Sequence, residues 1–165
     1  MARALDDPEG AVQAAAVGQL RKRRIPGTMT RLMELLDHPD ELVSAAAREA
    51  LAEFSFDNYA SRFDVLEEDA RRTMGVRVAK VDRTVAARLK QELGHPARRQ
   101  RLRALEMADA MGAAALLADA LIERLEDEDH LVRVAAAELL QHCTAEDVRM
   151  ALLAAVGDKS VAVQN

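Results

Sequence analysis

The stretch LDHPDELVSAAAREAL, residues 36–51, decides how the rest of this chain is interpreted. It has the order of a short loop, a capped helix start and an Ala-rich helix with one apolar face. The same order returns along the chain, and in four copies a Val follows a Leu or Val anchor by seven residues. Self-similarity at a fixed period is the signature of a repeat architecture. The anchors are Leu5, Leu36, Leu66, Leu93, Leu125 and Val156.

The spacing of the anchors is nearly constant, at 31, 30, 27, 32 and 31 residues. Residues 54–111 lack the Ala triplet, but the spacing fills them with two degenerate repeats and leaves no room for an inserted domain. We therefore expect one all-α domain over residues 1–165, an α-solenoid of stacked antiparallel helix pairs. The predicted pairs cover 28–53, 56–81, 83–111 and 114–143, with single helices over 7–24 and 145–156 on either side.

The composition favours helices with a surface of mixed charge. Half of the residues are apolar, many of them Ala, whereas aromatic residues make up 2%. The net charge of −5 gives no general attraction to nucleic acid or to an anionic membrane. Cys143 has no second cysteine for an internal disulfide, and no apolar run approaches the roughly 18 residues of a membrane span. These features predict a cytoplasmic protein that does not enter a membrane.

Both ends of the sequence fall inside a repeat. Residues 1–4 are too few for the first helix of a pair, and the last helix stops at Asn165 after less than two turns. Solenoids close their apolar ends with polar capping repeats, and the sequence pattern contains none. We expect either a fragment of a longer protein or end-to-end self-association.

The repeats resemble a known family. Helix pairs of about 30 residues, with an acidic or Pro-containing inner turn followed by V-x-x-A-A-x-x-L, resemble HEAT repeats of the short bacterial class, also seen in phycobilisome-lyase-like proteins. In this class a basic residue often follows the Val, and here Arg133 does so, whereas Gln13, Ser44 and Gln164 occupy the matching places. The resemblance implies a right-handed α-solenoid whose second helices line a concave face. It implies binding rather than catalysis, although fold does not settle function.

All four aromatic residues fall within ten residues, at Phe54, Phe56, Tyr59 and Phe63. Two interpretations stay open. Spacings of three and four place Phe56, Tyr59 and Phe63 on one face of a helix, as expected for a core stripe. Large amphipathic side chains are also common in binding hot spots, so Tyr59 is a candidate anchor for a partner.

Two basic clusters occur, at 21–24 and 98–103. The second lies near the start of a second helix, where arginine side chains suit an acidic or phosphate-bearing partner. The alternative is a solvated helix face that pairs with acidic residues at 67–69 and 92. The candidate partner-binding residues are the possible aromatic anchor and the arginines expected on the groove side of the second helices: Tyr59, Arg48, Arg72, Arg77, Arg99, Arg103 and Arg133.

No motif indicates catalysis or a cofactor. The sequence contains no Gly-rich phosphate loop, no G-x-S-x-G, no H-E-x-x-H and no C-x-x-C. His142 adjoins Cys143 and lies near Glu138 and Asp147, but metal sites usually need three or four converging ligands. We expect neither an enzyme nor a bound metal or cofactor.

The favoured function is a protein–protein interaction scaffold or adaptor that binds a partner, including an acidic protein, along the concave face. A second possibility is a lyase- or chaperone-like accessory factor for a cofactor-bearing protein, with its pocket in the degenerate repeats 54–111. A third is binding of nucleic acid, since some HEAT-like folds are alkylpurine DNA glycosylases. The net negative charge and the absence of Trp make this third function the least favoured.

Overall fold

The computed structural model describes residues 2–5, 7–22 and 27–150. Every regular element in these ranges is helical, which confirms the all-α prediction. The chain is also helical over 145–150, whereas the anchor Val156 and the rest of the last predicted helices lie outside the described residues. The elements are α1 (Ala2–Leu5), α2 (Gly10–Lys22), α3 (Thr28–Leu35), α4 (Glu41–Ala50), α5 (Phe56–Arg62), the 3-10 turn η1 (Phe63–Val65), α6 (Glu68–Val81), α7 (Val85–Leu93), α8 (Arg98–Met111), the 3-10 turn η2 (Ala114–Leu117), α9 (Ala118–Arg124) and α10 (His130–Leu140).

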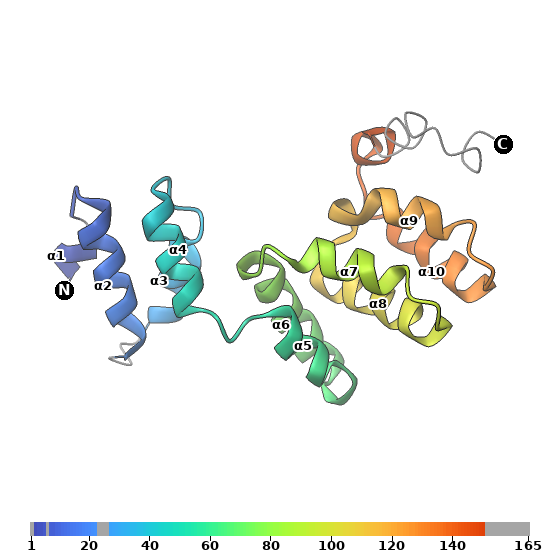
Figure 1. Ribbon diagram of the computed structural model, residues 1–165, viewed down its shortest axis with the longest axis horizontal. Coiled ribbons are helices and arrows are strands. Elements are labelled where there is room, and N and C mark those ends of the chain that lie inside the picture. Colours follow the sequence, from blue (N-terminus) through green and yellow to red (C-terminus); the bar gives the residue numbers. More distant parts are fainter. Residues whose placement is uncertain (1, 6, 23–26, 151–165) are drawn as a thin grey trace.

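The helices form a row that runs from α1 to α10 (Figure 1). Along the row α3 packs on α4, α5 on α6, α7 on α8 and α9 on α10. The second helices of neighbouring pairs also contact each other, because α2 packs on α4, α6 on α8 and α8 on α10. The helix boundaries agree with the predicted pairs to within a few residues.

The row of second helices is interrupted between α4 and α6. Among the described helices, these two make no contact comparable to the others, and residues 51–55 connect the separated ribbons (Figure 1). Two ion pairs bridge the interruption: Lys80 Nζ lies 2.9 Å from Asp37 Oδ2, and Arg83 Nη1 lies 3.2 Å from Glu41 Oε1. All four side chains are exposed, so water and salt screen both pairs.

Aspartates begin several helices at the positions where the sequence pattern places them. In α4 and α10 the side chains of Asp40 and Asp129 accept a hydrogen bond from the backbone N–H two residues further on, at 2.8 Å and 2.9 Å. Asp82 makes a similar bond just before α7, because its Oδ1 accepts from Thr84 N at 2.8 Å, but the N-cap residue of α7 is Thr84 itself. Each carboxylate thereby satisfies an amide that has no partner inside its own helix.

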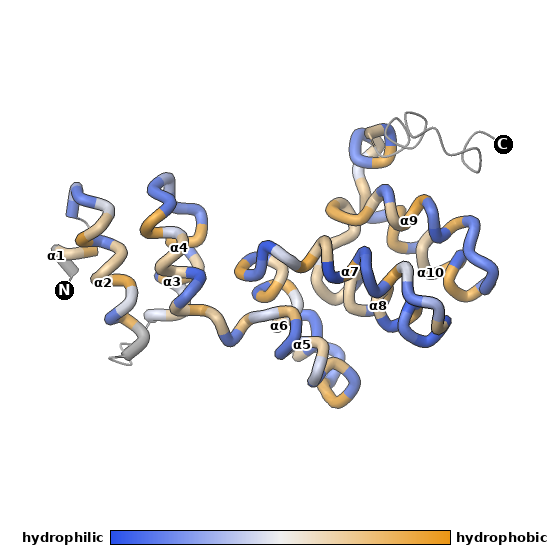
Figure 2. The backbone as a smooth tube through the Cα atoms, viewed as in Figure 1, coloured by the Kyte–Doolittle hydropathy of each residue, from blue (hydrophilic) through white to orange (hydrophobic). Residues whose placement is uncertain are grey.

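Equivalent repeat positions build the core. Val43 and Val132, which follow their anchors by seven residues, are fully buried, and so are Ala47 and Ala136 four residues later. Figure 2 shows how hydrophobic and hydrophilic residues alternate along each helix. Val12 also follows its anchor by seven residues, but 38% of its surface is exposed, so this repeat position is not part of the core in α2. Helix α2 turns a neighbouring stripe toward α4, and this stripe buries Ala16, Val17 and Leu20.

The aromatic cluster belongs to the core. Phe56, Tyr59 and Phe63 are 3%, 0% and 1% exposed, which confirms the core interpretation of their spacing. The Tyr59 and Phe63 rings meet edge to face, with their centroids 5.5 Å apart. The Tyr59 hydroxyl donates a hydrogen bond to Arg71 O in α6 at 2.9 Å, so the ring ties α5 to α6.

Helices α6 and α8 approach each other closely at Gly75. A Cβ atom at this position would lie 2.7 Å from Ala110 O and 2.9 Å from the Tyr59 hydroxyl. Since the first of these atoms is backbone, a larger residue could enter only if α8 moved. Gly75 therefore sets the distance between two second helices.

Two glycines follow helix ends, where the left-handed conformation is common, and they behave differently. Gly112 follows α8 with φ of 62°, which is left-handed. Gly94 follows α7 with φ of −85°, which is not. Gly94 N donates to Lys90 O at 3.1 Å and His95 N donates to Glu92 O at 3.1 Å, and these two bonds close α7 without a positive φ.

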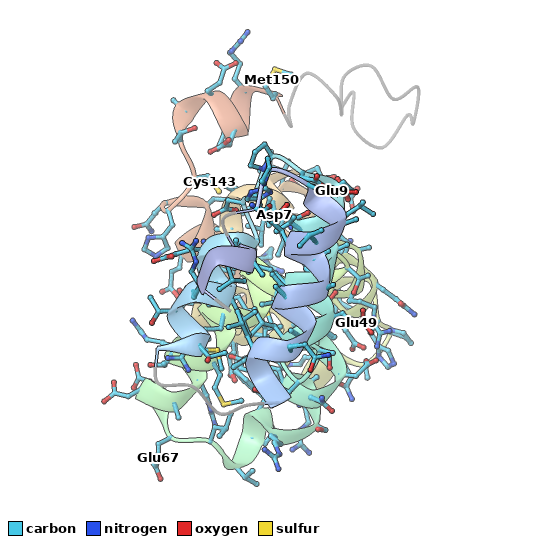
Figure 3. The ribbon with its side chains drawn as sticks, turned by 90° about the vertical axis from the view of Figure 1, so that its left-hand side faces the viewer. Asp7, Glu9, Glu49, Glu67, Cys143 and Met150 are labelled. Atoms are coloured by element: carbon cyan, nitrogen blue, oxygen red, sulfur yellow. The ribbon has the colours of Figure 1, made fainter. Side chains whose placement is uncertain are left out.

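The last described segment stands apart from the row. Figure 3 views the molecule from the N-terminal end of the row, and the helical segment that ends at Met150 projects away from the superimposed helices. No helix within residues 2–5, 7–22 and 27–150 combines the length and apolar character needed to cross a membrane.

Candidate partner-binding face

A hollow lies at each of the three contacts between second helices. The hollow between α2 and α4 has a volume of about 570 Å³, the one between α8 and α10 about 440 Å³, and the one between α6 and α8 about 150 Å³. We use the name second-helix face for the surfaces of the second helices around these three hollows. The sequence pattern placed the candidate contact surface on these same helices, but it did not predict where the hollows lie.

The hollow between α8 and α10, called the α8–α10 groove below, has an apolar floor. Leu105 and Leu139 are 2% and 5% exposed, and they line the groove together with the half-buried Leu102 and Ala135. The lining residues recur at spacings of three and four, which places them on one stripe of each helix. The full lining consists of Leu102, Leu105, Glu106, Asp109, Ala135, Glu138, Leu139, Gln141 and His142.

The rim of the α8–α10 groove is acidic. Glu106 and Asp109 project from α8 and Glu138 projects from α10, and all three are exposed. Within the described part of the chain, the carboxylates of Glu106 and Glu138 make no hydrogen bond or ion pair, whereas Asp109 Oδ2 lies 3.9 Å from Arg72 Nη2. The rim therefore presents two uncompensated carboxylates and a third that is weakly paired.

The smaller hollow between α6 and α8 continues the same surface. It shares Glu106 and Asp109 with the α8–α10 groove and adds the Arg72 side chain from α6. Arg72 pairs with Glu68 at 3.1 Å as well as with Asp109. The two hollows thus form one surface across α6, α8 and α10, on which carboxylates outnumber cations.

The hollow between α2 and α4 has a different lining. Its walls are mostly small residues, with polar ends supplied by Gln19, Glu49 and Glu53. Small side chains let the two helices approach closely. The small residues are Ala14, Gly18, Ala46, Ala50 and Ala52.

Two of the predicted contact arginines bind carbonyl groups of their own helix pair. Arg48 Nη2 donates to Leu36 O at 3.2 Å, and Arg133 Nη1 donates to Asp127 O at 2.6 Å. In both pairs the arginine of the second helix holds the end of the first helix or the turn after it. The Nε and Nη1 atoms of Arg48 are buried and have no hydrogen-bond partner in the described structure.

Arg103, a third predicted contact residue, is bound across the α5–α8 boundary. Its Nε lies 3.1 Å from both carboxylate oxygens of Asp64, and its Nη2 donates to Ala60 O. The guanidinium also lies 5.7 Å from the centroid of the Phe63 ring. These contacts give Arg103 a structural role, and charge reversal there would disturb the fold.

The remaining predicted arginines are more accessible. Arg72 is exposed on the second-helix face, and the Arg77 guanidinium lies 6.0 Å from the centroid of the Phe54 ring. Arg99 is exposed and makes no hydrogen bond or ion pair to the described residues. The structure therefore does not gather the six arginines into one basic surface, and their role in binding stays a prediction.

Tyr59, the predicted aromatic anchor, is completely enclosed. Burial raises the pKa of its phenol to about 12 because the phenolate is disfavoured away from water, and the nearby Arg71 only partly opposes this. With an exposure of 0%, the ring has no surface to offer a partner in this conformation.

The basic cluster at 98–103 pairs with carboxylates other than those predicted at 67–69 and 92. Arg98 Nε lies 2.9 Å from Asp129 Oδ2. Arg101 is 4% exposed, and its Nη2 lies 3.0 Å from Asp127 Oδ1 and 3.1 Å from Glu128 Oε1. Burial lowers the pKa of Arg101, but its hydrogen bonds to the two carboxylates raise it by more, so the guanidinium stays charged.

The buried pair of Arg101 and Asp127 was not predicted, although the spacing from the anchors indicates the role of Arg101. Arg101 follows the anchor Leu93 by eight residues, as Arg133 follows Leu125. The degenerate repeat that begins at Leu93 lacks the Val, so the two arginines look equivalent only when positions are counted from the anchors. Both donate to the carbonyls of the turn that precedes their helix.

The residues around His142 and Cys143 do not form a metal centre. Across the described ranges no three His, Cys, Asp or Glu side chains gather at metal-binding geometry. Burial raises the pKa of the Cys143 thiol, and the Asp147 carboxylate raises it further. Asp147 itself accepts from Thr144 N at 2.9 Å, so it caps the segment 145–150 rather than joining His142.

The second-helix face therefore carries a hollow at each contact between second helices, and the α8–α10 groove combines leucine side chains at its floor with an acidic rim. A comparison with protein-family models and with curated proteins finds no match for this chain.

Proposed function

We propose that this chain is a HEAT-like α-solenoid segment that acts as a scaffold for protein–protein interaction. The partner binds along the second-helix face. The observation that carries this proposal is the open α8–α10 groove, which is lined by the half-buried Leu102 and Ala135 beside two carboxylates that have no partner in the described structure. An open groove with a few polar groups at its edge is a common form of binding site.

The chemistry of the face supports protein binding over nucleic-acid binding. Phosphate backbones are bound by clustered Lys and Arg side chains, and four of the six candidate arginines are held by carboxylates or carbonyls of the chain itself. The rim of the α8–α10 groove carries carboxylates, which repel phosphates. A protein surface with complementary charge faces no such repulsion.

The test is a position-specific photo-crosslinking scan in a lysate of the source cells. A benzophenone side chain replaces Glu49, Glu106 or Glu138 on second helices. Matched control positions on first helices are the exposed residues Thr30, Gln91 and Glu123. We expect discrete crosslinked proteins from the second-helix positions only. Equal crosslinking from both sets, or none from either, would refute a binding face on the second helices.

A further inference from the structure

The α8–α10 groove combines leucine side chains at its floor with an acidic rim. Two buried leucines, Leu105 and Leu139, lie at its base, and three carboxylates lie at its edges. We infer that its occupant is a basic amphipathic helix of a partner protein. This inference rests on the proposed function, because it names the kind of partner that the second-helix face binds.

The shape of the groove favours a helix as occupant. Its walls are two neighbouring helices, with lining residues at i, i+3, i+4 and i+7 from Leu102 to Asp109 in α8 and at i, i+3 and i+4 from Ala135 to Leu139 in α10, while Gln141 and His142 follow the end of α10. A partner helix lays apolar side chains into such a groove at the same spacings.

The negative charge of the groove rim favours an occupant with positive charge. Glu106 and Glu138 stand on opposite walls and have no cation beside them within the described structure. Lys or Arg residues that flank the apolar stripe of a partner helix would reach both walls. An acidic helix would instead place like charges against the rim, which costs binding free energy. The rim therefore contributes specificity, and the half-buried Leu102 and Ala135 contribute the apolar contact area.

The experiment uses the full chain and two fluorescent probe peptides. Both carry Leu at i, i+3, i+4 and i+7 of a helix, and one has Lys and the other Glu at the remaining positions. Fluorescence anisotropy gives the Kd of each peptide. The groove variant is Glu106→Lys/Glu138→Lys. The control variant, Glu67→Lys/Glu126→Lys, makes the same change in net charge at exposed residues outside the groove, and Glu67 points away from the row of helices in Figure 3.

We expect the Lys peptide to bind saturably and the Glu peptide not to bind. The groove variant should weaken the Lys peptide about tenfold or more, whereas the control variant should change its Kd less than about twofold. Circular dichroism checks that both variants keep the helical content of the wild type. Equal weakening by both variants would show attraction by net charge alone and overturn the inference.

Binding of the Glu peptide would overturn the inference in the same way. The crosslinking scan separates this failure from a failure of the proposed function. If the second-helix positions crosslink to proteins but the Lys peptide does not bind, the face is a scaffold with a different kind of partner. If the second-helix positions do not crosslink, the scaffold function itself fails.

Discussion

Arg101 Nη2 lies 3.0 Å from Asp127 Oδ1, and this buried ion pair joins α8 to the turn between α9 and α10. The guanidinium also donates to His95 O and Pro96 O, at 3.1 Å and 2.9 Å, so it links two successive turns between helices. One side chain thereby sets the position of one helix pair on the next.

Replacing Arg101 with Met should destabilise the protein by about 3 kcal/mol, because the change leaves a buried carboxylate with a weaker partner. Asp127 would keep its hydrogen bond from Asp129 N and a more distant cation, Arg124, at 3.6 Å. Urea unfolding followed by circular dichroism measures the free energy of unfolding. The matched control is Arg99→Met, two residues away, which removes an exposed arginine and should change stability by less than about 0.5 kcal/mol. Equal stabilities of the two variants would show that the buried pair contributes nothing.

Replacing Gly75 with Ala should destabilise the protein by about 1–3 kcal/mol. The new Cβ would lie 2.7 Å from the backbone oxygen of Ala110, so α6 and α8 must move apart. The control is Gly18→Ala in α2, where a Cβ meets nothing within 4 Å. Because Ala is the better helix former, this second change should stabilise the protein by about 0.5–1 kcal/mol. Thermal unfolding of both variants checks the opposite signs, and a shift of Tm in the same direction would contradict the close approach.

Gly75 shows what the sequence can and cannot predict. Helix positions and the buried stripes of α4 and α10 follow from the repeat pattern, because capping residues and apolar spacing act locally. The close approach at Gly75 depends on Ala110, which is 35 positions away in the sequence, and no periodicity records that contact. Val12 stays exposed for a related reason, since the helices that pack on α2 determine which of its stripes is buried.

The candidate site was predictable only in part. The pattern placed a contact surface on the second helices, where the hollows lie, but it selected arginines by their position in the sequence. Arg103 shows why this choice was incomplete. Its partner Asp64 lies in a different helix pair, and this internal ion pair neutralises the charge that would otherwise attract a ligand. The acidic rim was missed because Glu106 and Glu138 look like ordinary solvated residues until α8 and α10 are placed side by side.

Asp82 should make the stability of the protein depend on pH in the acidic range. Burial raises the pKa of this carboxyl, but hydrogen bonds from Phe56 N and Thr84, with Arg88 nearby, lower it by more, so its pKa lies below the ordinary value of 3.8. A carboxyl with a lowered pKa stabilises the fold above its unfolded pKa and loses that contribution as the pH falls through its folded pKa. We therefore expect the contribution of Asp82 to disappear below about pH 4.

The variant that isolates this contribution is Asp82→Asn. The carboxylate accepts from Phe56 N through Oδ2 and from Thr84 N through Oδ1, both at 2.8 Å, whereas an amide has a single acceptor oxygen. The variant should lose about 1 kcal/mol at neutral pH and show a shallower loss of stability in acid. Unfolding by urea at a series of pH values measures both effects. A pH profile parallel to that of the wild type would exclude Asp82 as a source of the slope.

The interruption between α4 and α6 should make the connection at 51–55 sensitive to charge. Lys80 and Arg83 reach across it to Asp37 and Glu41, and each exposed pair contributes less than about 1 kcal/mol. Because no comparable helix packing supports this boundary among the described helices, Lys80→Glu/Arg83→Glu should loosen the junction without unfolding either side.

Limited proteolysis measures this loosening, since local opening exposes backbone to a protease long before global unfolding. We expect the double variant to be cleaved faster within 51–55, and the wild type to be cleaved faster there in 1 M salt, where charges are screened beyond about 3 Å. The control is Lys90→Glu, which breaks an ion pair with Asp119 at a boundary where α7 also packs on α9. Because helix packing holds that boundary, the Lys90→Glu variant should be cleaved no faster than the wild type. Acceleration by the control as well would mean that surface charge, rather than the missing helix contact, governs opening.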